Sequence, residues 1–134
     1  MVRGLSTGPL MNHTMPYTRI VARTDGTSAF EDAEIVLTER QIAPGVPSML
    51  VGGLAAAASV TFLRSNGFDS EPHPAPRRQW VMMLRGMIDV TVSDGSKRRF
   101  GPGDLVLAAD TTGVGHVTVA MGEGPFEGLF VAAD

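Results

Sequence analysis

The stretch 73-HPAPRRQWVMMLRG-86, followed by 101-GPGD-104 and 113-GVGH-116, decides the expected fold of this chain. Residues 79–84 carry large apolar side chains, which predicts a strand. Pro74 and Pro76 have no backbone N–H to donate, so they place residues 73–76 at the start or the edge of a sheet. GPGD is a turn sequence, because glycine adopts the backbone angles that tight turns require. The stretch therefore predicts strands joined by turns, with a histidine at each end.

Short apolar runs separated by turn residues also occur in the rest of the chain. Ile88, Val90 and Val92 alternate with polar residues, which is the pattern of a strand with one buried face. The Asp-Gly pair at 94–95 then predicts a tight hairpin. Eight or so short strands at this spacing favour an all-β fold, either a barrel or a sandwich. The expected strands are residues 34–38, 59–63, 79–84, 87–92, 98–100, 105–108, 117–120 and 128–131, with a turn at 54–58.

These motifs resemble the two sequence motifs of the cupins, a family of small β-barrels with an internal pocket. The first cupin motif is His-x-His, three or four residues, Glu, six residues and Gly; the second places a Pro-Gly turn before a further His. His73, Gly86 and His116 stand where the family has its first histidine, its glycine and its last histidine. The resemblance implies one antiparallel jelly-roll β-barrel, the double-stranded β-helix of the cupins.

The metal ligands of the cupin motif are only partly present in this chain. Ala75 stands at the second histidine of the motif, and Gln79 stands at its glutamate. Two imidazoles and an amide are a poor set for Fe(II), which prefers two histidines and a carboxylate. The resemblance therefore favours a pocket without a cofactor, and a divalent Fe, Mn, Ni or Zn ion held by His73, Gln79 and His116 is the alternative. Asp110 is a further carboxylate near the last motif, but its sequence context first suggests a turn.

A pocket of this composition suits acid–base chemistry. His73 and His116 can serve as general acid and general base near neutral pH. Arg77 can fix a carboxylate, enolate or phosphate through paired hydrogen bonds, and Gln79 can bind a carbonyl or hydroxyl. We expect an isomerase, dehydratase, cyclase or lyase that acts on a small organic substrate. The alternatives are a metal-dependent, oxygenase-like cupin and a cupin that binds a ligand without converting it, because one fold hosts many functions.

Alternation along a strand indicates which side chains share a face. The inward set is His73, Ala75, Arg77, Gln79, Val81 and Met83, and the outward set is Trp80, Met82 and Leu84. The candidate substrate contacts are Arg77, Gln79, Met83 and Trp80, and a role for Arg78 is left open. An exposed apolar row of the outward kind is rare on soluble monomers. A segment around residues 35–37 can cover part of it, and we expect a partner subunit in a two-fold homodimer to cover the rest.

The composition of the chain limits its possible partners and location. With 134 residues, 43% hydrophobic and 19% charged, it is expected to form one globular domain at residues 16–134 after a loose leader at 1–15. A net charge of −3 provides no basic surface for nucleic acid. Residues 41–63 are uncharged, but their prolines and glycines argue against a membrane helix. The chain has no cysteine, which excludes disulfides and thiolate chemistry, and we expect a cytoplasmic protein.

Overall fold

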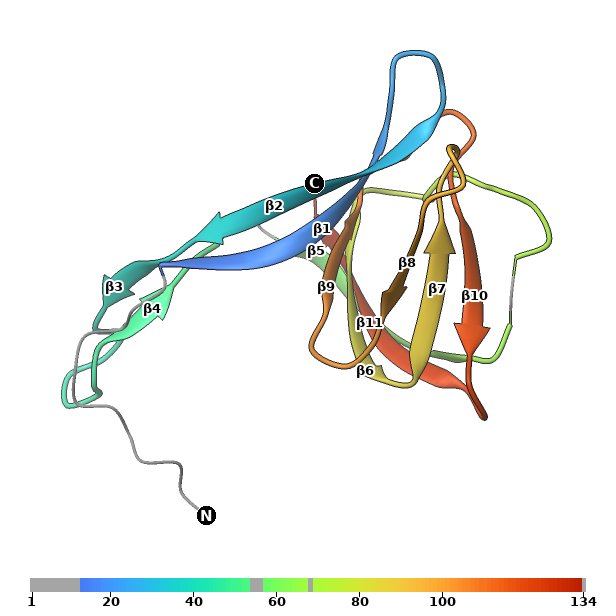
Figure 1. The fold of residues 1–134 in the computed structure, drawn as a ribbon. Helices are drawn as coiled ribbons and strands as arrows, with labels where there is room; N and C mark the ends of the chain where they lie inside the picture. Colours follow the sequence, from blue (N-terminus) through green and yellow to red (C-terminus); the bar gives the residue numbers. More distant parts are fainter. Residues whose placement is uncertain (1–12, 54–56, 68, 134) are drawn as a thin grey trace.

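The computed structural model describes residues 13–53, 57–67 and 69–133, and its regular structure there consists of strands alone (Figure 1). This confirms the all-β prediction. No helix within these residues is long and apolar enough to cross a membrane. The strands are β1 (Thr14–Ala22), β2 (Ser28–Val36), β3 (Thr38–Arg40), β4 (Met49–Val51), β5 (Ala57–Ser65), β6 (Gln79–Arg85), β7 (Met87–Thr91), β8 (Lys97–Phe100), β9 (Leu105–Ala108), β10 (Val117–Met121) and β11 (Phe126–Ala133).

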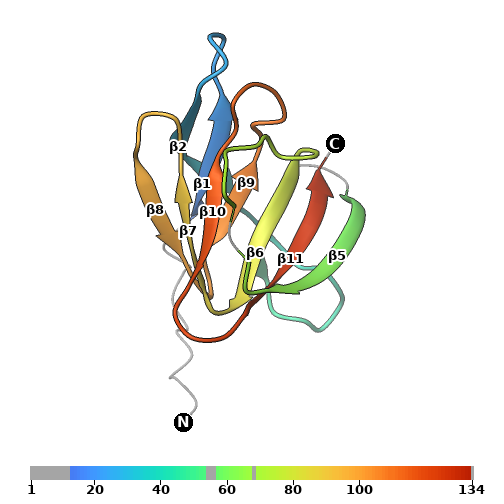
Figure 2. The ribbon, with the colours of Figure 1, turned by 90° about the vertical axis from the view of Figure 1, so that its right-hand side faces the viewer.

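The strands form two facing sheets (Figure 2) and a separate hairpin of β3 and β4 (Figure 1). The larger sheet has the order β2-β1-β9-β6-β11-β5, the smaller one has the order β10-β7-β8, and β3 pairs with β4. All paired strands are antiparallel except β1 and β9, which run parallel. The prediction of a purely antiparallel barrel is therefore wrong for β1 and β9. Parallel neighbours need a long crossover, and here the whole chain between β1 and β9 provides it.

The strands around the quoted stretch lie where the sequence predicts them. β6 and β7 begin at the predicted residues, and β9 spans the predicted range. The hairpin between β7 and β8 turns at Gly95, which has a φ of 86° and donates its N–H to the carbonyl of Val92 at 2.9 Å. In the GPGD turn, the Asp104 N–H donates to the Gly101 carbonyl at 3.0 Å. Local turn chemistry therefore determines this part of the fold.

The N-terminal strands differ from the prediction. β1 is not among the expected strands and begins at Thr14, inside the expected leader, and β2 begins at Ser28 rather than at Glu34. The two strands pair along their whole length, from Thr14↔Val36 to Ala22↔Ser28. Cross-strand pairing of this extent stabilises strands whose own pattern is weak. Residues 1–12 of the expected leader and residues 54–56 of the expected turn lie outside the described residues.

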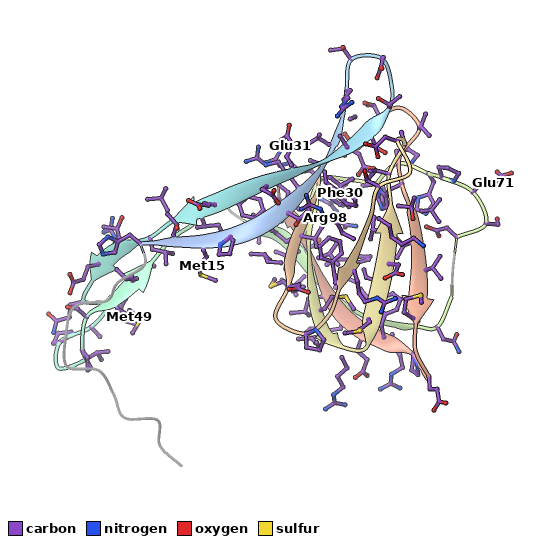
Figure 3. All side chains as sticks on the ribbon, in the orientation of Figure 1. Met15, Phe30, Glu31, Met49, Glu71 and Arg98 are labelled. Carbon is purple, nitrogen blue, oxygen red and sulfur yellow. The ribbon has the colours of Figure 1, made fainter. Side chains whose placement is uncertain are left out.

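An extended ribbon, the arm, projects from the two sheets (Figure 1). We define the arm as residues 13–16 and 34–51; it includes one end of the β1–β2 ribbon and the β3–β4 hairpin. Only Thr18 to Ile20 of β1 pair with β9, so among the described residues the arm has no strand partner on that side. Figure 3 shows Met15 and Met49 on the arm, away from the sheets. The arm has four large exposed apolar side chains, namely Met15, Val36, Ile42 and Met49.

The main core lies between the two sheets. Its buried residues come from both sheets, and they include the predicted inward row of Ile88, Val90 and Val92. The other members are Ile20, Met83, Phe100 and Val106. Burying one such side chain stabilises the fold by about 1.5–3 kcal/mol. These apolar side chains therefore hold the two sheets together.

A second cluster covers the outer face of the larger sheet. Trp80 packs there with Leu107 and Ile35, and its ring meets that of Tyr17 edge to face at 4.9 Å between centroids. This confirms that Trp80 points outward and that Ile35 helps to cover it. Leu84, farther along β6, stays 49% exposed. The N-terminal strands therefore cover only one end of the outward row.

Candidate functional site

A cavity of about 450 Å³ opens between the two sheets. This volume is in the range of small-molecule binding sites. Its walls are mainly apolar, and its polar side chains include Asp69, His73, Gln79, His116 and Thr118. The structure thus brings the two histidines and the glutamine of the sequence analysis to one cavity. Ala75 also lines it, and is 4% exposed.

The connection from β5 to β6 runs beside β10 and brings the two histidines together. The Asp69 N–H donates to the Thr118 carbonyl at 2.9 Å. The backbones of His73 and His116 exchange hydrogen bonds of 3.1 and 3.0 Å, so the two residues face each other as a β-bridge. Their rings are 5.8 Å apart between centroids. Figure 3 shows this connection at Glu71, along the edge of the fold.

Two glycines allow the loop before His116 to approach its neighbours. Gly115 has a φ of 80°, and a Cβ at this position would collide with the backbone of His73. Gly113 has a φ of 78°, and a Cβ there would collide with Gly26 in the β1–β2 turn. Because side chains are strained at positive φ and a Cβ would collide at both positions, only glycine fits at residues 113 and 115. The GVGH sequence therefore serves the close packing that places His116.

His116 is paired with a fully buried carboxylate. Its Nδ1 lies 2.5 Å from Oδ2 of Asp110, which is 0% exposed. Within the described part of the chain, Oδ1 of Asp110 has no hydrogen-bond partner. With Asp110 ionised, the Nδ1–H of His116 is the donor, and Nε2 is the nitrogen left for a ligand. A buried carboxylate next to an imidazole thus fixes the tautomer of that imidazole.

His73 is paired with a second carboxylate near the opening of the cavity. Its Nε2 lies 3.0 Å from Oδ2 of Asp69, and its Nδ1 lies 3.1 Å from the Pro74 carbonyl. The same Asp69 oxygen accepts the Thr118 N–H at 2.8 Å. The bond to the Pro74 carbonyl, and then the bond to Asp69, raise the pKa of His73 above its usual value. Both contacts favour the imidazolium, which donates from both nitrogens.

Gln79 is a buried amide at the first residue of β6. It pairs with Ala108 of β9, is 7% exposed and lines the cavity. Within the described residues its side chain forms no hydrogen bond. Its side chain lines the cavity, so the amide can donate to or accept from a bound molecule.

The other candidate residues lie outside the cavity lining. Arg77 is exposed, because the chain bends at residues 76–78 and the alternation of an extended strand does not continue through a bend. Met83 is buried in the main core, and Trp80 is on the opposite face of β6. Arg78 is exposed, and its carbonyl accepts the Ala133 N–H at 3.0 Å.

Sequence reasoning did not assign roles to the two carboxylates. Asp69 lay in an expected loop, and no pattern linked it to His73. Asp110 offered a weak signal, since the glycines of residues 111–116 let the chain turn back and bring Asp110 beside His116. A charge in a turn is usually solvated, which is why the turn was the first interpretation.

The donor atoms do not fit a metal ion. Both ring nitrogens of His73 are engaged, one by the Pro74 carbonyl and one by Asp69, whereas a metal ligand needs a free lone pair. Gln79 supplies a neutral oxygen, and Ala75 supplies none. No group of three or more His, Cys, Asp or Glu residues in the described ranges is arranged to hold a metal ion. These contacts therefore do not support the alternative of a divalent ion held by His73, Gln79 and His116.

No protein-family model matches this chain, and no curated protein matches it significantly.

Proposed function

We propose that this chain is a jelly-roll barrel of the cupin type whose cavity performs acid–base chemistry on a small organic molecule. The reaction is an isomerisation, dehydration, cyclisation or lyase step. The motif spacing, the two facing sheets and the cavity between them support the fold. The observation that carries the function is the His116–Asp110 pair, whose imidazole lines the cavity beside the His73–Asp69 pair.

His116 is the base in this proposal. Its Nε2 takes a proton from a carbon next to a carbonyl, and the electron pair of the broken C–H bond moves into an enolate. Asp110 stabilises the resulting imidazolium, because their contact becomes an ion pair. The proton then returns from Nε2 to the same carbon or to another carbon of the enolate, which balances the reaction.

His73 and Gln79 act on the oxygen of the substrate. The positive charge of the His73 imidazolium stabilises the enolate oxygen, and its Nε2–H is shared between Asp69 and that oxygen. The amide of Gln79 donates to the same oxygen from β6. Preorganised donors of this kind are effective because they are already in place when charge develops.

Exchange of α-protons in simple ketones tests the proposal, so the natural substrate itself is not required. A panel of cyclic and aromatic ketones is incubated with the protein in D₂O, and loss of the α-proton signal is followed by NMR. We expect exchange with the wild type and a decrease of at least ~10²-fold in His116→Gln, the usual contribution of a general base. Arg78→Gln, an exposed residue outside the cavity lining, is the matched control and should exchange like the wild type.

Two outcomes would overturn the proposal. Equal exchange by the wild type and His116→Gln would remove His116 as the base. Binding of panel members without any exchange would instead support the ligand-binding alternative.

A further inference from the structure

The cavity is divided into a polar region and an apolar region by the register of its strands. On β6 and β9, Gln79 lies opposite Ala108, and the next inward pair is Val81 and Val106. On β10 and β7, Thr118 lies opposite Val90. Most of the polar side chains thus gather at the ends of β6 and β9 where His73 and His116 meet, and the remaining walls are apolar apart from Ser65, which pairs with Phe126.

The apolar region is lined by aliphatic and aromatic side chains. They come from β1, β5, β6, β7, β8, β9 and β11, so both sheets contribute to the walls. A molecule that fills this region exchanges water for apolar contacts over most of its surface. The walls are formed by Ile20, Val81, Ile88, Val90, Phe100 and Val106.

The charges at the polar region do not favour an anion. Among the described residues that line the cavity there is no lysine or arginine, and Arg77 is exposed outside it. Each histidine is paired with its own aspartate, so a protonated His73 is balanced by Asp69, and a protonated His116 by Asp110. With both carboxylates ionised, neither pair carries a net positive charge. A carboxylate or phosphate would lose its hydration here without gaining a counter-charge.

The same pairs do not favour a cation either. Both carboxylates are engaged by imidazoles, and Asp69 also accepts the Thr118 N–H. Asp110 is fully buried and does not line the cavity, so an ammonium group among the apolar walls would have only Asp69, already shared with His73 and Thr118, to replace its hydration.

We propose that the cavity takes an uncharged, mainly apolar molecule with one oxygen-bearing end, such as an aromatic or cyclic ketone, enol or phenol. This rests on the proposed function, because it names the substrate class of the same site. The oxygen lies among Gln79, His73 and His116, where an amide donor and an imidazole acceptor can both reach it. Gln79 is the specificity residue, because its amide faces the cavity and forms no hydrogen bond with the described residues.

A matched series of naphthalene derivatives tests this class by calorimetry at pH 7. The series contains 2-naphthol, 2-naphthoate, 2-naphthyl phosphate, 2-naphthylmethylamine and naphthalene itself. We expect 2-naphthol to bind at least tenfold more tightly than each charged member and more tightly than naphthalene. Gln79→Met, which keeps the length of the side chain but removes the amide, should lower the affinity for 2-naphthol at least ~3-fold toward that of naphthalene, because only the imidazoles then reach the oxygen. Gln79→Asn keeps the amide and should retain part of the preference, and circular dichroism verifies that both variants are folded.

Arg77→Gln distinguishes this inference from the sequence-based expectation that Arg77 binds a carboxylate, enolate or phosphate. If the cavity selects uncharged ligands, this substitution should leave all affinities unchanged. Tightest binding by 2-naphthoate or the phosphate, with a loss in Arg77→Gln, would overturn the inference, as would no binding by any member. The inference and the proposed function can fail separately: a ketone can exchange its proton while anions bind best, and 2-naphthol can bind as expected while no ketone exchanges.

Discussion

Replacing Asp110 tests whether its buried carboxylate supports His116. Asp110 is 0% exposed and its contact with His116 is 2.5 Å, so the pair is both buried and short. Removing one partner of a buried charged pair typically costs about 3–5 kcal/mol, and a neutral hydrogen bond contributes about 1 kcal/mol less than a charge-assisted one. We therefore expect Asp110→Ala to lower the free energy of unfolding by about 3 kcal/mol and Asp110→Asn to lower it by about 1 kcal/mol.

Urea unfolding followed by tryptophan fluorescence measures these changes. Asp32→Asn is the matched control, because Asp32 forms an ion pair with Arg98 at 2.7 Å while its side chain is 84% exposed. An exposed pair contributes at most about 1 kcal/mol, so this variant should unfold almost like the wild type. The double variant Asp110→Ala/His116→Gln should lose less than the sum of the single losses, since the residues are in contact.

A stabilised Asp110→Ala would refute this reasoning. Oδ1 of Asp110 has no hydrogen-bond partner among the described residues, and its desolvation acts against the folded state. If that cost exceeded the contribution of the His116 contact, removing the whole carboxylate would raise stability. The carboxylate would then be present at the expense of stability, and α-proton exchange by Asp110→Asn would show whether activity explains it.

Three further outcomes are expected. The pKa of His73 is raised from its usual 6.5, so its contribution to the free energy of unfolding is complete below pH 6.5 and is lost as pH rises through the folded-state pKa. NMR titration should show a lower His73 pKa in Asp69→Asn than in the wild type. An unchanged pKa would contradict the role of Asp69. Gly115→Ala should lower the free energy of unfolding by more than Gly95→Ala. Both residues have a positive φ, whose strain costs about 1–2 kcal/mol, but only the Cβ added at residue 115 would collide with the His73 backbone. Equal losses in urea unfolding would refute the collision. We propose a two-fold homodimer that covers the remaining outward row and the apolar side chains of the arm. Light scattering should then give a dimer mass that Leu84→Ala weakens, because Leu84 is the exposed end of the row, whereas a monomer mass for the wild type would defeat the proposal.

The fold could be predicted where local sequence determines it. The strands between residues 79 and 108 have alternating or continuous apolar runs, and their turns contain glycines with positive φ at Gly95 and Gly103. β1 was missed because Pro16 and Arg19 interrupt its pattern, and its stability depends on pairing with β2 and β9. Such pairing is long-range, and no window of the sequence contains it.

The candidate site could be predicted only in outline. Motif spacing singled out His73 and His116, because spacing is a property of the sequence itself. The roles of Asp69 and Asp110 depend on the contacts that the fold gives them, and Asp110 is as buried as a core leucine. Arg77 was misplaced for the opposite reason, since strand alternation was extended through a segment that bends.

The position of β9 has a consequence for the order in which the protein forms during synthesis. β9 is four residues long, and it lies between β1 and β6, so it alone joins the β2-β1 pair to the β6-β11-β5 group within the larger sheet. The ribosome makes β1 and β2 early, but they have no place in the larger sheet until residues 105–108 have emerged, and a two-stranded ribbon alone is marginally stable in water. Sheets assembled from such distant segments form slowly. During that interval Tyr17 and Ile20 are exposed, so the nascent chain passes through a stage in which its N-terminal ribbon is vulnerable to pairing with another chain.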